Sequence, residues 1–459
     1  MPTETNVLVI GGGLTGLATA FYLKERGVPV EVLEAAPAAG GVIATRRRDG
    51  ALTEAGPNST LDTTPLLNEM FDRLGIRRER SDASAVASTR FIVRGGKLVA
   101  LPASPGAFFT TPAFSLRAKL ALLREPFIGR ASADVEESIA TFVRRRLGNE
   151  FLDYAIDPFV SGVYAGDPDA ISVPAAFPRL HALELKYGSL IKGQIKGARE
   201  RRANAETAKN TAGSFSFRAG MQTLTDSLAS AVGRVETGVD VMRIRKHPDG
   251  GFTVEGIRDG AVFARNARAV VLAAPAYAAA DLVREIAPSA VAPLQSIDYA
   301  PIAIAASCYR RPDVAHPLAG FGFLVPKKER RRILGSLFSS SMFEGRAPEG
   351  SVLLTTFVGG KRQPGLAALP DADVATIVHE ELAALVGAAA PPQWCEITRW
   401  RQAIPQYTLG HLGRIAVIEA AEASAPGLFL RGSYRDGVSV GDRVKAAHAS
   451  ADAVIRHFG

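Results

Sequence analysis

Cysteine is nearly absent from this 459-residue chain, which contains only Cys308 and Cys395. Two cysteines give no disulfide framework, and such a composition fits a reducing compartment. The seven histidines are scattered without the spacing of metal ligands, so we expect no metal site. No run reaches the roughly 18 apolar residues of a membrane-spanning helix. The apolar run at residues 7–10 breaks at glycine, so we expect no signal peptide and a cytoplasmic location.

The charge of the chain is moderate and positive. The formal net charge is +8, with 22% charged and 47% hydrophobic residues, which is an ordinary globular balance. The length favours two or three domains over one. A basic surface suits nucleic acid, anionic lipid or an acidic small molecule, and the charge alone does not choose among them.

A short apolar strand and a glycine-rich turn open the chain. Residues 7–10 read as a buried strand, and Gly11, Gly13 and Gly16 follow as G-x-G-x-x-G. A helical pattern and a second strand ending at Glu34 complete the unit. The glycines allow a tight turn, a close approach to a pyrophosphate and close helix packing, and the acid can accept from ribose hydroxyls. The unit therefore predicts a dinucleotide site.

The residues after this unit favour FAD over a nicotinamide cofactor. An NADP site would need an arginine near position 35, where Ala35 and Ala36 stand. The pair Gly40-Gly41 and the later Gly56-Pro57 resemble the FAD-binding pattern of the amine oxidase and carotenoid desaturase superfamily. No second G-x-G-x-x-G unit follows, so we expect an oxidase, or a desaturase with another acceptor, and not an NADPH-fed reductase.

The far end of the chain matches this reading. Residues 427–458 read as a strand, a glycine turn and a helix with one apolar face. In the superfamily that it resembles, this turn wraps the flavin and the helix dipole faces the pyrimidine edge. Alternating strands at 234–256 join the same domain. A plain packing helix is the alternative reading of the C-terminal segment alone.

Two stretches in the middle leave a membrane role open. Residues 110–212 are predicted to be helical. Within them, residues 186–210 are basic and polar, which fits a solvated helix or linker, or a contact with anionic lipid. Residues 105–129 mix Phe and Leu with Arg and Lys, and they could lie in a membrane interface or line a pocket. Residues 276–404 are mostly strands, with the basic run 327–332 predicted as a hairpin tip.

Five separated segments make the resemblance more specific. The segments are WRQAIPQYTLGH (400–411), DPFVSGVYAGDP (157–168), TRFIVRGGKLVALP (89–102), GFGFLVP (320–326) and GSYRDGVSV (432–440). They closely resemble segments of the protoporphyrinogen oxidase family, the FAD enzymes of haem and chlorophyll synthesis. Taken alone, the stretch 157–168 reads as a turn because of its Asp-Pro and Gly residues.

The resemblance implies an α/β fold, α+β overall. It comprises a Rossmann-like FAD-binding domain from residues 1–60, 213–275 and 400–459, a mixed-sheet substrate domain from 85–109 and 276–399, and a helical, membrane-associated or pocket region at 110–212. It also implies non-covalent FAD, bound by Gly11, Gly12, Gly13, Leu14, Thr15, Gly16, Glu34, Ala35, Gly41, Val42, Gly56, Pro57, Asn58, Ser59, Val241, Trp400, Val438, Ser439 and Val440.

The same resemblance implies a substrate pocket. Its residues are Arg90, which matches an arginine that pairs with a propionate, and Gly162, Val163, Phe321, Leu324 and Phe357. A porphyrinogen is a large apolar ring with carboxylates on its rim, so apolar walls and a permanent cation suit it. No residue is singled out as an acid or base.

The implied reaction is the six-electron oxidation of protoporphyrinogen IX to protoporphyrin IX, by three hydride transfers to flavin, with oxygen as acceptor and hydrogen peroxide as product. Coproporphyrinogen III is the alternative substrate, followed by a flavin amine oxidase and a non-catalytic flavin or porphyrin carrier. Expected partners are the porphyrinogen, oxygen and a peripheral membrane contact, with a homodimer or a neighbouring haem-pathway enzyme also open. Nucleic acid is not expected.

Overall fold

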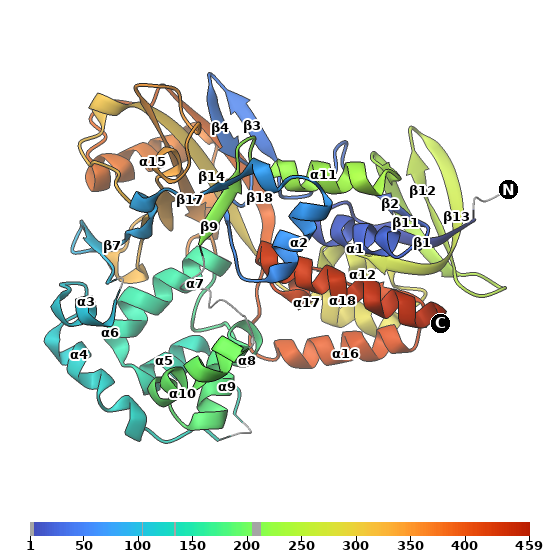
Figure 1. The fold of residues 1–459 in the computed structure, drawn as a ribbon, viewed down its shortest axis with the longest axis horizontal. Coiled ribbons are helices and arrows are strands. Elements are labelled where there is room, and N and C mark those ends of the chain that lie inside the picture. The colour runs from blue at the N-terminus through green and yellow to red at the C-terminus, as the bar shows by residue number, and fades with distance from the viewer. Residues whose placement is uncertain (1–3, 103, 133–134, 204–212) are drawn as a thin grey trace.

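The computed structural model describes residues 4–102, 104–132, 135–203 and 213–459. A mixed sheet in the strand order β10-β2-β1-β13-β12-β11, with β19 beside β13, lies near both termini (Figure 1). β1, β2, β10, β13 and β19 are parallel neighbours, whereas β11 and β12 are antiparallel. The strands are β1 (Glu4–Ile10), β2 (Val30–Leu33), β10 (Val235–Glu236), β11 (Val239–Lys246), β12 (Phe252–Arg258), β13 (Ala261–Leu272) and β19 (Leu428–Leu430).

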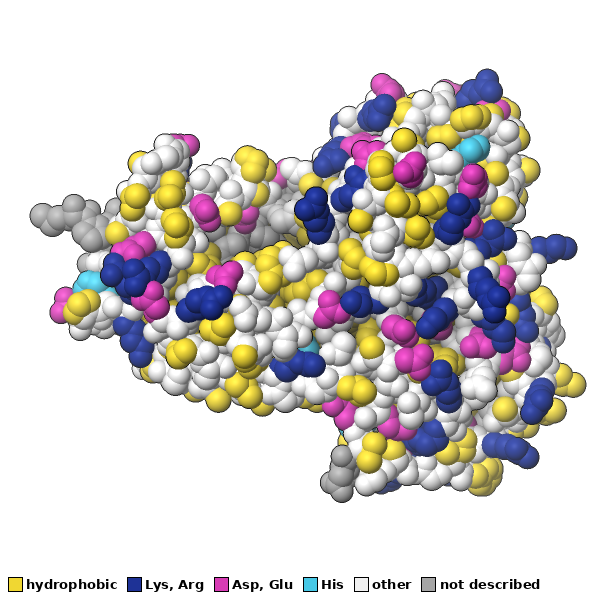
Figure 2. Space-filling view, turned by 180° about the vertical axis from the view of Figure 1, so that it is seen from behind, with side chains coloured by type: hydrophobic (Ala, Val, Ile, Leu, Met, Phe, Trp, Pro, Cys, Tyr) yellow, Lys and Arg dark blue, Asp and Glu magenta, His cyan; other side chains and the backbone are white. Residues whose placement is uncertain are grey.

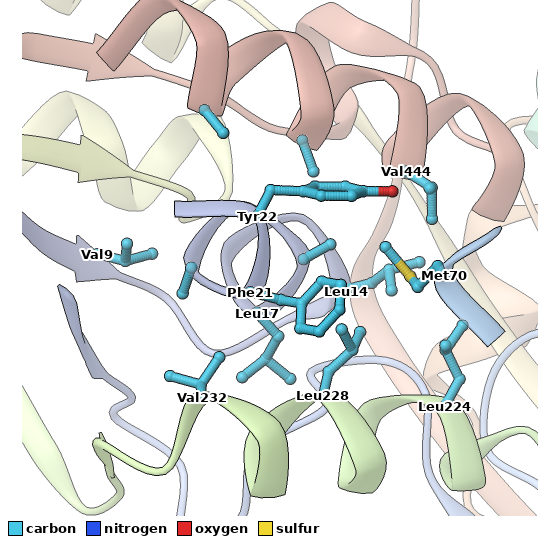
Figure 3. Packing of buried hydrophobic residues seen from close by; sticks show 14 of the residues in the cluster. Val9, Leu14, Leu17, Phe21, Tyr22, Met70, Leu224, Leu228, Val232 and Val444 are labelled. Carbon is cyan, nitrogen blue, oxygen red and sulfur yellow. The ribbon is translucent and has the colours of Figure 1, made fainter. Parts of the chain in front are cut away.

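Helices bury both faces of this first sheet. One face packs against α1 (Leu14–Glu25), α2 (Pro65–Arg73), α11 (Gln222–Val232) and α18 (Val440–Phe458). Figure 3 shows this core, in which Leu17 and Phe21 of α1 point toward Leu228 of α11, and Tyr22 points toward α18. The other face packs against α12 (Ala276–Leu282), α13 (Val291–Gln295), α16 (His411–Ala423) and α17 (Ser433–Asp436). The first and last segments of the chain thus share one core.

A second mixed sheet has the order β18-β14-β17-β16-β15-β7-β8. Helix α15 (Asp371–Val386) covers one face through a buried apolar cluster. The strands are β7 (Arg90–Arg94), β8 (Lys97–Ala100), β14 (Tyr299–Arg310), β15 (Gly322–Leu324), β16 (Gly335–Leu337), β17 (Ser351–Gly359) and β18 (Trp394–Pro405). Two small sheets complete the strands, formed by β3 (Thr45–Arg48) with β4 (Ala51–Glu54), and by β5 (Thr60–Leu61), β9 (Ser214–Phe217) and β6 (Arg80–Asp82).

Helices between residues 105 and 203 form a third region beneath the second sheet (Figure 1). Its members are α3 (Pro105–Thr110), α4 (Leu116–Leu122), α5 (Ile139–Arg146), α6 (Asn149–Phe151), α7 (Asp157–Tyr164), α8 (Val173–Ala176), α9 (Pro178–Tyr187) and α10 (Leu190–Ala203), with the 3₁₀ turn η3 (Glu125–Phe127) and the π-helical turn η4 (Leu152–Ile156).

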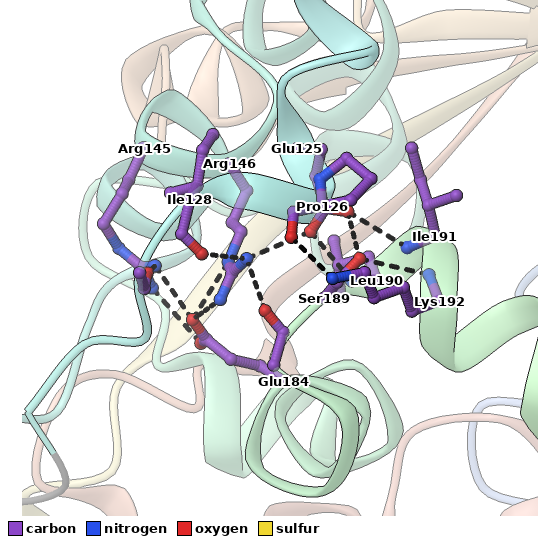
Figure 4. A network of polar contacts seen from close by, with 12 residues as sticks. Glu125, Pro126, Ile128, Arg145, Arg146, Glu184, Ser189, Leu190, Ile191 and Lys192 are labelled. Carbon is purple, nitrogen blue, oxygen red and sulfur yellow. Dashed lines mark hydrogen bonds and ion pairs between the residues drawn. The ribbon is translucent and has the colours of Figure 1, made fainter.

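A buried ionic network holds these helices together (Figure 4). Arg146 is 1% exposed and pairs with both Glu125 and Glu184. Glu125 also accepts hydrogen bonds from the Ser189 hydroxyl and the Leu190 N–H, at 2.5 and 2.8 Å. Because each buried charge has a partner, the network fixes η3 against α5, α9 and the start of α10.

The stretch 157–168 is not the turn that its composition alone suggests. It forms α7 through Tyr164, and the helix ends where Ala165 adopts φ +48°. The π-helical turn η4 leads directly into α7, so Pro158 lies just after a π-helical turn within one continuous helical run rather than at a free helix end.

The basic run 327–332 lies between β15 and β16, as predicted, and four of its basic side chains form ion pairs. Lys327 and Lys328 pair with Asp167 and Asp153 of the helical region, whereas Arg331 and Arg332 pair with acids of α15. On the face shown in Figure 2, Lys and Arg likewise lie among Asp and Glu.

Among the described residues, no helix combines the length and apolar character needed to cross a membrane. Of the polar stretch 186–210, α10 extends to Ala203, and residues 204–210 lie outside the described part. The predicted α/β class with a mixed-sheet partner is present. The three-way domain division by residue range stays a prediction.

Candidate active site

The turn between β1 and α1 requires glycine at two positions for steric reasons. Gly11 has φ +107°, and a Cβ there would lie 2.9 Å from the Ala273 carbonyl carbon. A Cβ on Gly16 would lie 1.9 Å from the Gly11 carbonyl oxygen. These two glycines therefore let α1 start directly over the end of β1.

Gly13 differs from its neighbours because a Cβ there would meet nothing within 4 Å. It is the N-cap of α1 with extended backbone, so its side faces open space where the helix presents free N–H groups. A phosphate group fits such a place, since the helix dipole favours negative charge there. The predicted contact of Gly13 with a pyrophosphate is therefore sterically open.

Glu34 lies at the end of β2 and faces the same turn. Its carboxylate accepts from the Gly12 N–H at 2.5 Å and from the Ala36 N–H at 2.8 Å. The Glu34 carbonyl accepts from the N–H of Val239, the first residue of β11, which also carries Val241. Glu34, Ala35 and Val241 are thus brought to one end of the turn, as an adenosine-binding role requires.

The second glycine pair and the Gly-Pro turn close on the first turn. The Gly40 N–H donates to the Gly12 carbonyl at 2.8 Å. A Cβ on Gly41 would lie 3.2 Å from the Gly13 Cα, and one on Gly56 would lie 2.1 Å from the Val42 carbonyl oxygen. Tertiary contact therefore brings together the predicted cofactor residues of three separate segments.

Trp400 connects the second sheet to this cofactor region. Its indole N–H donates to the Ala55 carbonyl at 2.7 Å, directly before the Gly56-Pro57 turn. In the next residues, Asn58 is 8% exposed and its carboxamide oxygen accepts from the hydroxyls of Ser339 and Thr355, each at 3.4 Å. The Asn58 side-chain NH₂ has no partner among the described residues. It is a buried donor with free capacity beside the predicted flavin contacts.

The C-terminal turn reaches the site through α18. Ser439 is the N-cap of α18, and its hydroxyl accepts from the Asp442 N–H. Val438 packs against the apolar cluster of the helical region, and Val440 packs in the core of α1. The predicted contacts Val438, Ser439 and Val440 therefore bridge the two regions.

Tyr407 is a positioning residue to which sequence reasoning gave no role. Its hydroxyl donates to the Ser433 carbonyl and accepts from the Gly437 N–H at 2.9 Å. Its neighbour Gln406 donates to the Tyr164 carbonyl at 2.8 Å. Both lie inside the segment 400–411, so the resemblance marked them, but only the fold shows that they tie the C-terminal turn and α7 to β18.

The ring of His411 stacks on Tyr407, with centroids 4.3 Å apart. Burial lowers the pKa of His411 to about 4, and a contact with the Tyr434 backbone opposes this shift only in part. Burial likewise raises the pKa of Tyr407 far above its usual range. Both side chains are therefore neutral near pH 7, and they stabilise the turn by packing rather than by charge.

Most of the predicted substrate residues meet at the junction of α7 and the second sheet. A Cβ on Gly162 would lie 2.8 Å from a Leu324 methyl group. Leu324 pairs with Gly335, which also pairs with Phe357 on β17. Phe357 in turn packs in the same apolar cluster as Trp400. An apolar wall thus leads from α7 to the residue that contacts the Gly56-Pro57 segment.

Arg90 and Phe321 lie side by side at the start of β7. The guanidinium of Arg90 stands over the Phe321 ring, 5.3 Å from its centroid, and Arg90 itself is exposed. Arg90 on β7 pairs with Gly322 on the neighbouring strand β15, and Leu324 lies two residues further along β15. The pairing of the two strands thus places the cation near Leu324. The remaining predicted residue, Val163, is 37% exposed on α7.

A deeper ion pair anchors α7 to the second sheet. Asp157 accepts from the Lys327 N–H at 2.8 Å and from the Arg362 guanidinium at 2.6 Å. Burial raises the pKa of Asp157 despite these contacts. The pair fixes the helix that carries Gly162.

The Flavin containing amine oxidoreductase family matches residues 14–455 of the chain. The chain belongs to this family. Within it, the chain is 33% identical to protoporphyrinogen oxidase 2 of Arabidopsis thaliana over 98% of this chain and 94% of the relative. It is 29% identical to coproporphyrinogen III oxidase of Bacillus subtilis over 99% of each chain. The resemblance to the porphyrinogen oxidases found in the sequence is therefore confirmed.

Solved structures agree with this family at the level of the fold. A proposed protoporphyrinogen oxidase from Exiguobacterium superposes with a TM-score of 0.80 at 24% identity, covering 99% of each chain. A putrescine oxidase variant gives 0.70 at 18% identity. As a member of this flavin-containing family, the chain is an FAD oxidoreductase, and the open position at Gly13 fits that cofactor.

Proposed function

We propose that this chain oxidises protoporphyrinogen IX to protoporphyrin IX. The substrate loses six hydrogens in three two-electron steps, and each step reduces one O₂ to H₂O₂. Bound FAD supplies the two-electron acceptor for each step. The relatives named as porphyrinogen oxidases support the reaction class, because they match almost the whole chain.

The observation that carries the proposal is the apolar wall that ends at a free cation. Gly162, Leu324 and Phe357 offer a surface without charge. Arg90 is the charged group beside it, and its guanidinium forms no ion pair among the described residues. A flat, apolar ring with a carboxylate on its rim matches both features.

The roles of the residues follow from their places. Arg90 binds a rim carboxylate and sets the orientation of the ring. The α7 wall holds the ring and excludes water on one side. Three protons accompany the three hydrides, two from pyrrole nitrogens and one from a ring carbon, and they leave to solvent. His411 is not offered as their acceptor, because its pKa of about 4 makes the buried ring, which is stacked on Tyr407, a weak base near pH 7.

The test is anaerobic mixing of the purified yellow protein with protoporphyrinogen IX. We expect the visible absorbance band of the oxidised flavin to bleach. Admission of oxygen should then give porphyrin fluorescence and three molecules of hydrogen peroxide per porphyrin. A flavin-loaded protein whose spectrum does not respond to any porphyrinogen would be the non-catalytic carrier instead.

Coproporphyrinogen III is the second candidate, since relatives of that name match the chain over its whole length. It carries four propionates where protoporphyrinogen carries two. The ratio of kcat/KM for the two substrates, measured under the same conditions, decides between them. A cationic amine suits the site less, because it would meet the positive charge of Arg90.

We also propose that the helical region docks on an anionic membrane surface. Large apolar side chains stand exposed on α3, α4 and η3 and on the residue after α4. They are Phe109 (67%), Leu116 (71%), Leu120 (55%), Leu123 (63%) and Phe127 (86%). Arg117 and Arg124 are exposed between them. Apolar side chains alternating with cations are typical of an interfacial contact, and they favour the lipid reading of residues 105–129 over a pocket.

Vesicle sedimentation tests this surface. We expect the wild type to sediment with phosphatidylglycerol vesicles and less with phosphatidylcholine, and the double variant Leu116→Asp/Phe127→Asp to stay in the supernatant. Val262→Asp is the matched control, since Val262 is 81% exposed on β13 of the first sheet. Equal sedimentation of all three proteins would show that this surface does not bind the membrane.

A further inference from the structure

Arg443 extends from the first turn of α18 to the first turn of α1. It is the fourth residue of α18, and its guanidinium donates to the Thr15 hydroxyl at 3.0 Å. Thr15 is the second residue of α1, is 2% exposed and follows the open position at Gly13 closely. The cation therefore stands at the cofactor turn, although the sequence reading gave it no role.

Arg443 has no carboxylate partner among the described residues. Three arginines are more than nine-tenths buried, and each of them forms an ion pair. Arg146 pairs with Glu125 and Glu184, Arg346 with Glu54, and Arg431 with Glu422. Arg443 is half-buried and forms no ion pair within the described part of the chain.

The electrostatic surroundings make this arrangement costly without an anion. Burial lowers the pKa of Arg443, and the carboxyl groups of Asp436 and Asp442 offset this only in part. The guanidinium also lies where α1 and α18 both begin, and helix N-termini carry partial positive charge. Three positive features in one place favour a bound anion.

The other side of the turn supplies no cation. Residues 34–42, which run from the ribose-binding acid to the second glycine pair, read EAAPAAGGV and contain neither Lys nor Arg. A pyrophosphate beside Gly13 would therefore have to find its positive partner elsewhere in the fold.

We propose that Arg443 binds the pyrophosphate of FAD and is the cation on which this chain depends for cofactor affinity. Thr15 holds the guanidinium in place through its hydroxyl. This role concerns the cofactor and is independent of which substrate the enzyme oxidises.

The test compares Arg443→Gln with the wild type in apoprotein titrations followed by flavin fluorescence. We expect the Kd for FAD to rise roughly 10- to 100-fold, because a hydrogen bond to a charged group is lost. The Kd for ADP, measured by its effect on Tm, should rise in parallel, whereas the Kd for riboflavin, which lacks phosphate, should change less than about twofold. The salt dependence of FAD binding should also weaken.

Arg443→Lys and Arg456→Gln complete the design. The lysine variant keeps the charge and should recover part of the FAD affinity. Arg456 is exposed near the C-terminal end of the same helix, so Arg456→Gln removes one charge and should leave all three Kd values unchanged. If Arg443→Gln binds FAD like the wild type, or weakens riboflavin as much as FAD, the pyrophosphate assignment is wrong. Should the glutamine variant not fold, the same ligand comparison with Arg443→Lys decides.

Discussion

A single missing side chain sets how closely α7 approaches the second sheet. Gly162 faces Leu324 at a distance that leaves no room for a Cβ without movement of the leucine. Sequence composition alone would place this glycine in a turn, but its use is in helix-to-sheet contact at the substrate wall.

Gly162→Leu should therefore impair turnover. Overpacking of about 1–3 kcal/mol would push α7 from Leu324, and we expect kcat/KM for the porphyrinogen to fall at least about tenfold, with bound FAD unchanged. Steady-state kinetics and the flavin spectrum measure both. Gly413→Ala, on α16 where a Cβ meets nothing within 4 Å, is the control. Normal turnover in Gly162→Leu would detach α7 from the pocket.

Arg90 gives a second prediction at this scale. Arg90→Ala removes a free guanidinium beside Phe321, so KM for the porphyrinogen should rise about tenfold through loss of one charged hydrogen bond, while kcat and the flavin spectrum stay similar. Arg90→Lys should recover only part, because an ammonium cannot bind a carboxylate through a planar fork. An unchanged KM would place Arg90 outside the substrate site.

At the scale of the element, two glycines of the strand–turn–helix unit serve different purposes, since Gly13 leaves room for the cofactor and Gly16 allows the unit to pack. Gly13→Val should abolish FAD binding and leave the apoprotein folded, because its side chain enters open space. Gly16→Ala should instead lower Tm of the apoprotein, because its Cβ meets the Gly11 carbonyl. Flavin content and thermal unfolding measure the two effects. Full FAD occupancy in Gly13→Val would refute the pyrophosphate position.

The segment that starts α16 makes stability depend on pH. His411 has a pKa near 4 in the folded protein, below its usual value of about 6.5 in the unfolded chain. The unfolded chain therefore binds more protons between these values, and stability falls as the pH drops through this window. The full loss amounts to about 3 kcal/mol.

We expect His411→Phe, which keeps a ring on Tyr407, to lose less Tm than the wild type between pH 7 and pH 5. His181→Gln, at a half-buried position on α9, should follow the wild type. Thermal unfolding at the two pH values measures the difference. Parallel losses in wild type and His411→Phe would show that another group titrates.

At the scale of the whole molecule, buried ion pairs join segments that lie far apart in the chain. Arg346 pairs with Glu54 at 2.7 Å and donates to the Ser216 hydroxyl at 2.5 Å. These contacts connect the loop between α14 (Ser339–Met342) and β17 to β4 and β9. The cofactor side and the second sheet thus share a buried charge pair.

Arg346→Met should lower the free energy of unfolding by about 3–5 kcal/mol, because Glu54 would be left charged and buried. Arg284→Met is the matched control, since its pair with Asp281 is exposed on both sides and should contribute less than about 1 kcal/mol. Urea unfolding measures both. Similar losses in the two variants would mean that the buried pair does not hold the segments together.

Local sequence was enough for the cofactor motif and the family. The glycine turn with its strand, helix and terminal acid depends on short-range geometry, so its residues could be named from spacing. The segment 157–168 shows the limit. Its Asp-Pro and Gly residues suggest a turn, whereas residues 157–164 form the helix α7, whose Gly162 lies against Leu324. The substrate residues came from resemblance, since no spacing rule brings Arg90 to Phe321.

Only the tertiary structure could assign Arg443, Tyr407 and the buried pairs. Their partners lie far away in the chain, as Arg443 and Thr15 do at a separation of 428 residues. Whether a charge is paired depends on which segments meet and on what solvent they exclude, and a one-dimensional pattern carries neither quantity. The glycines thus specify where a phosphate fits, and the fold decides which cation it meets.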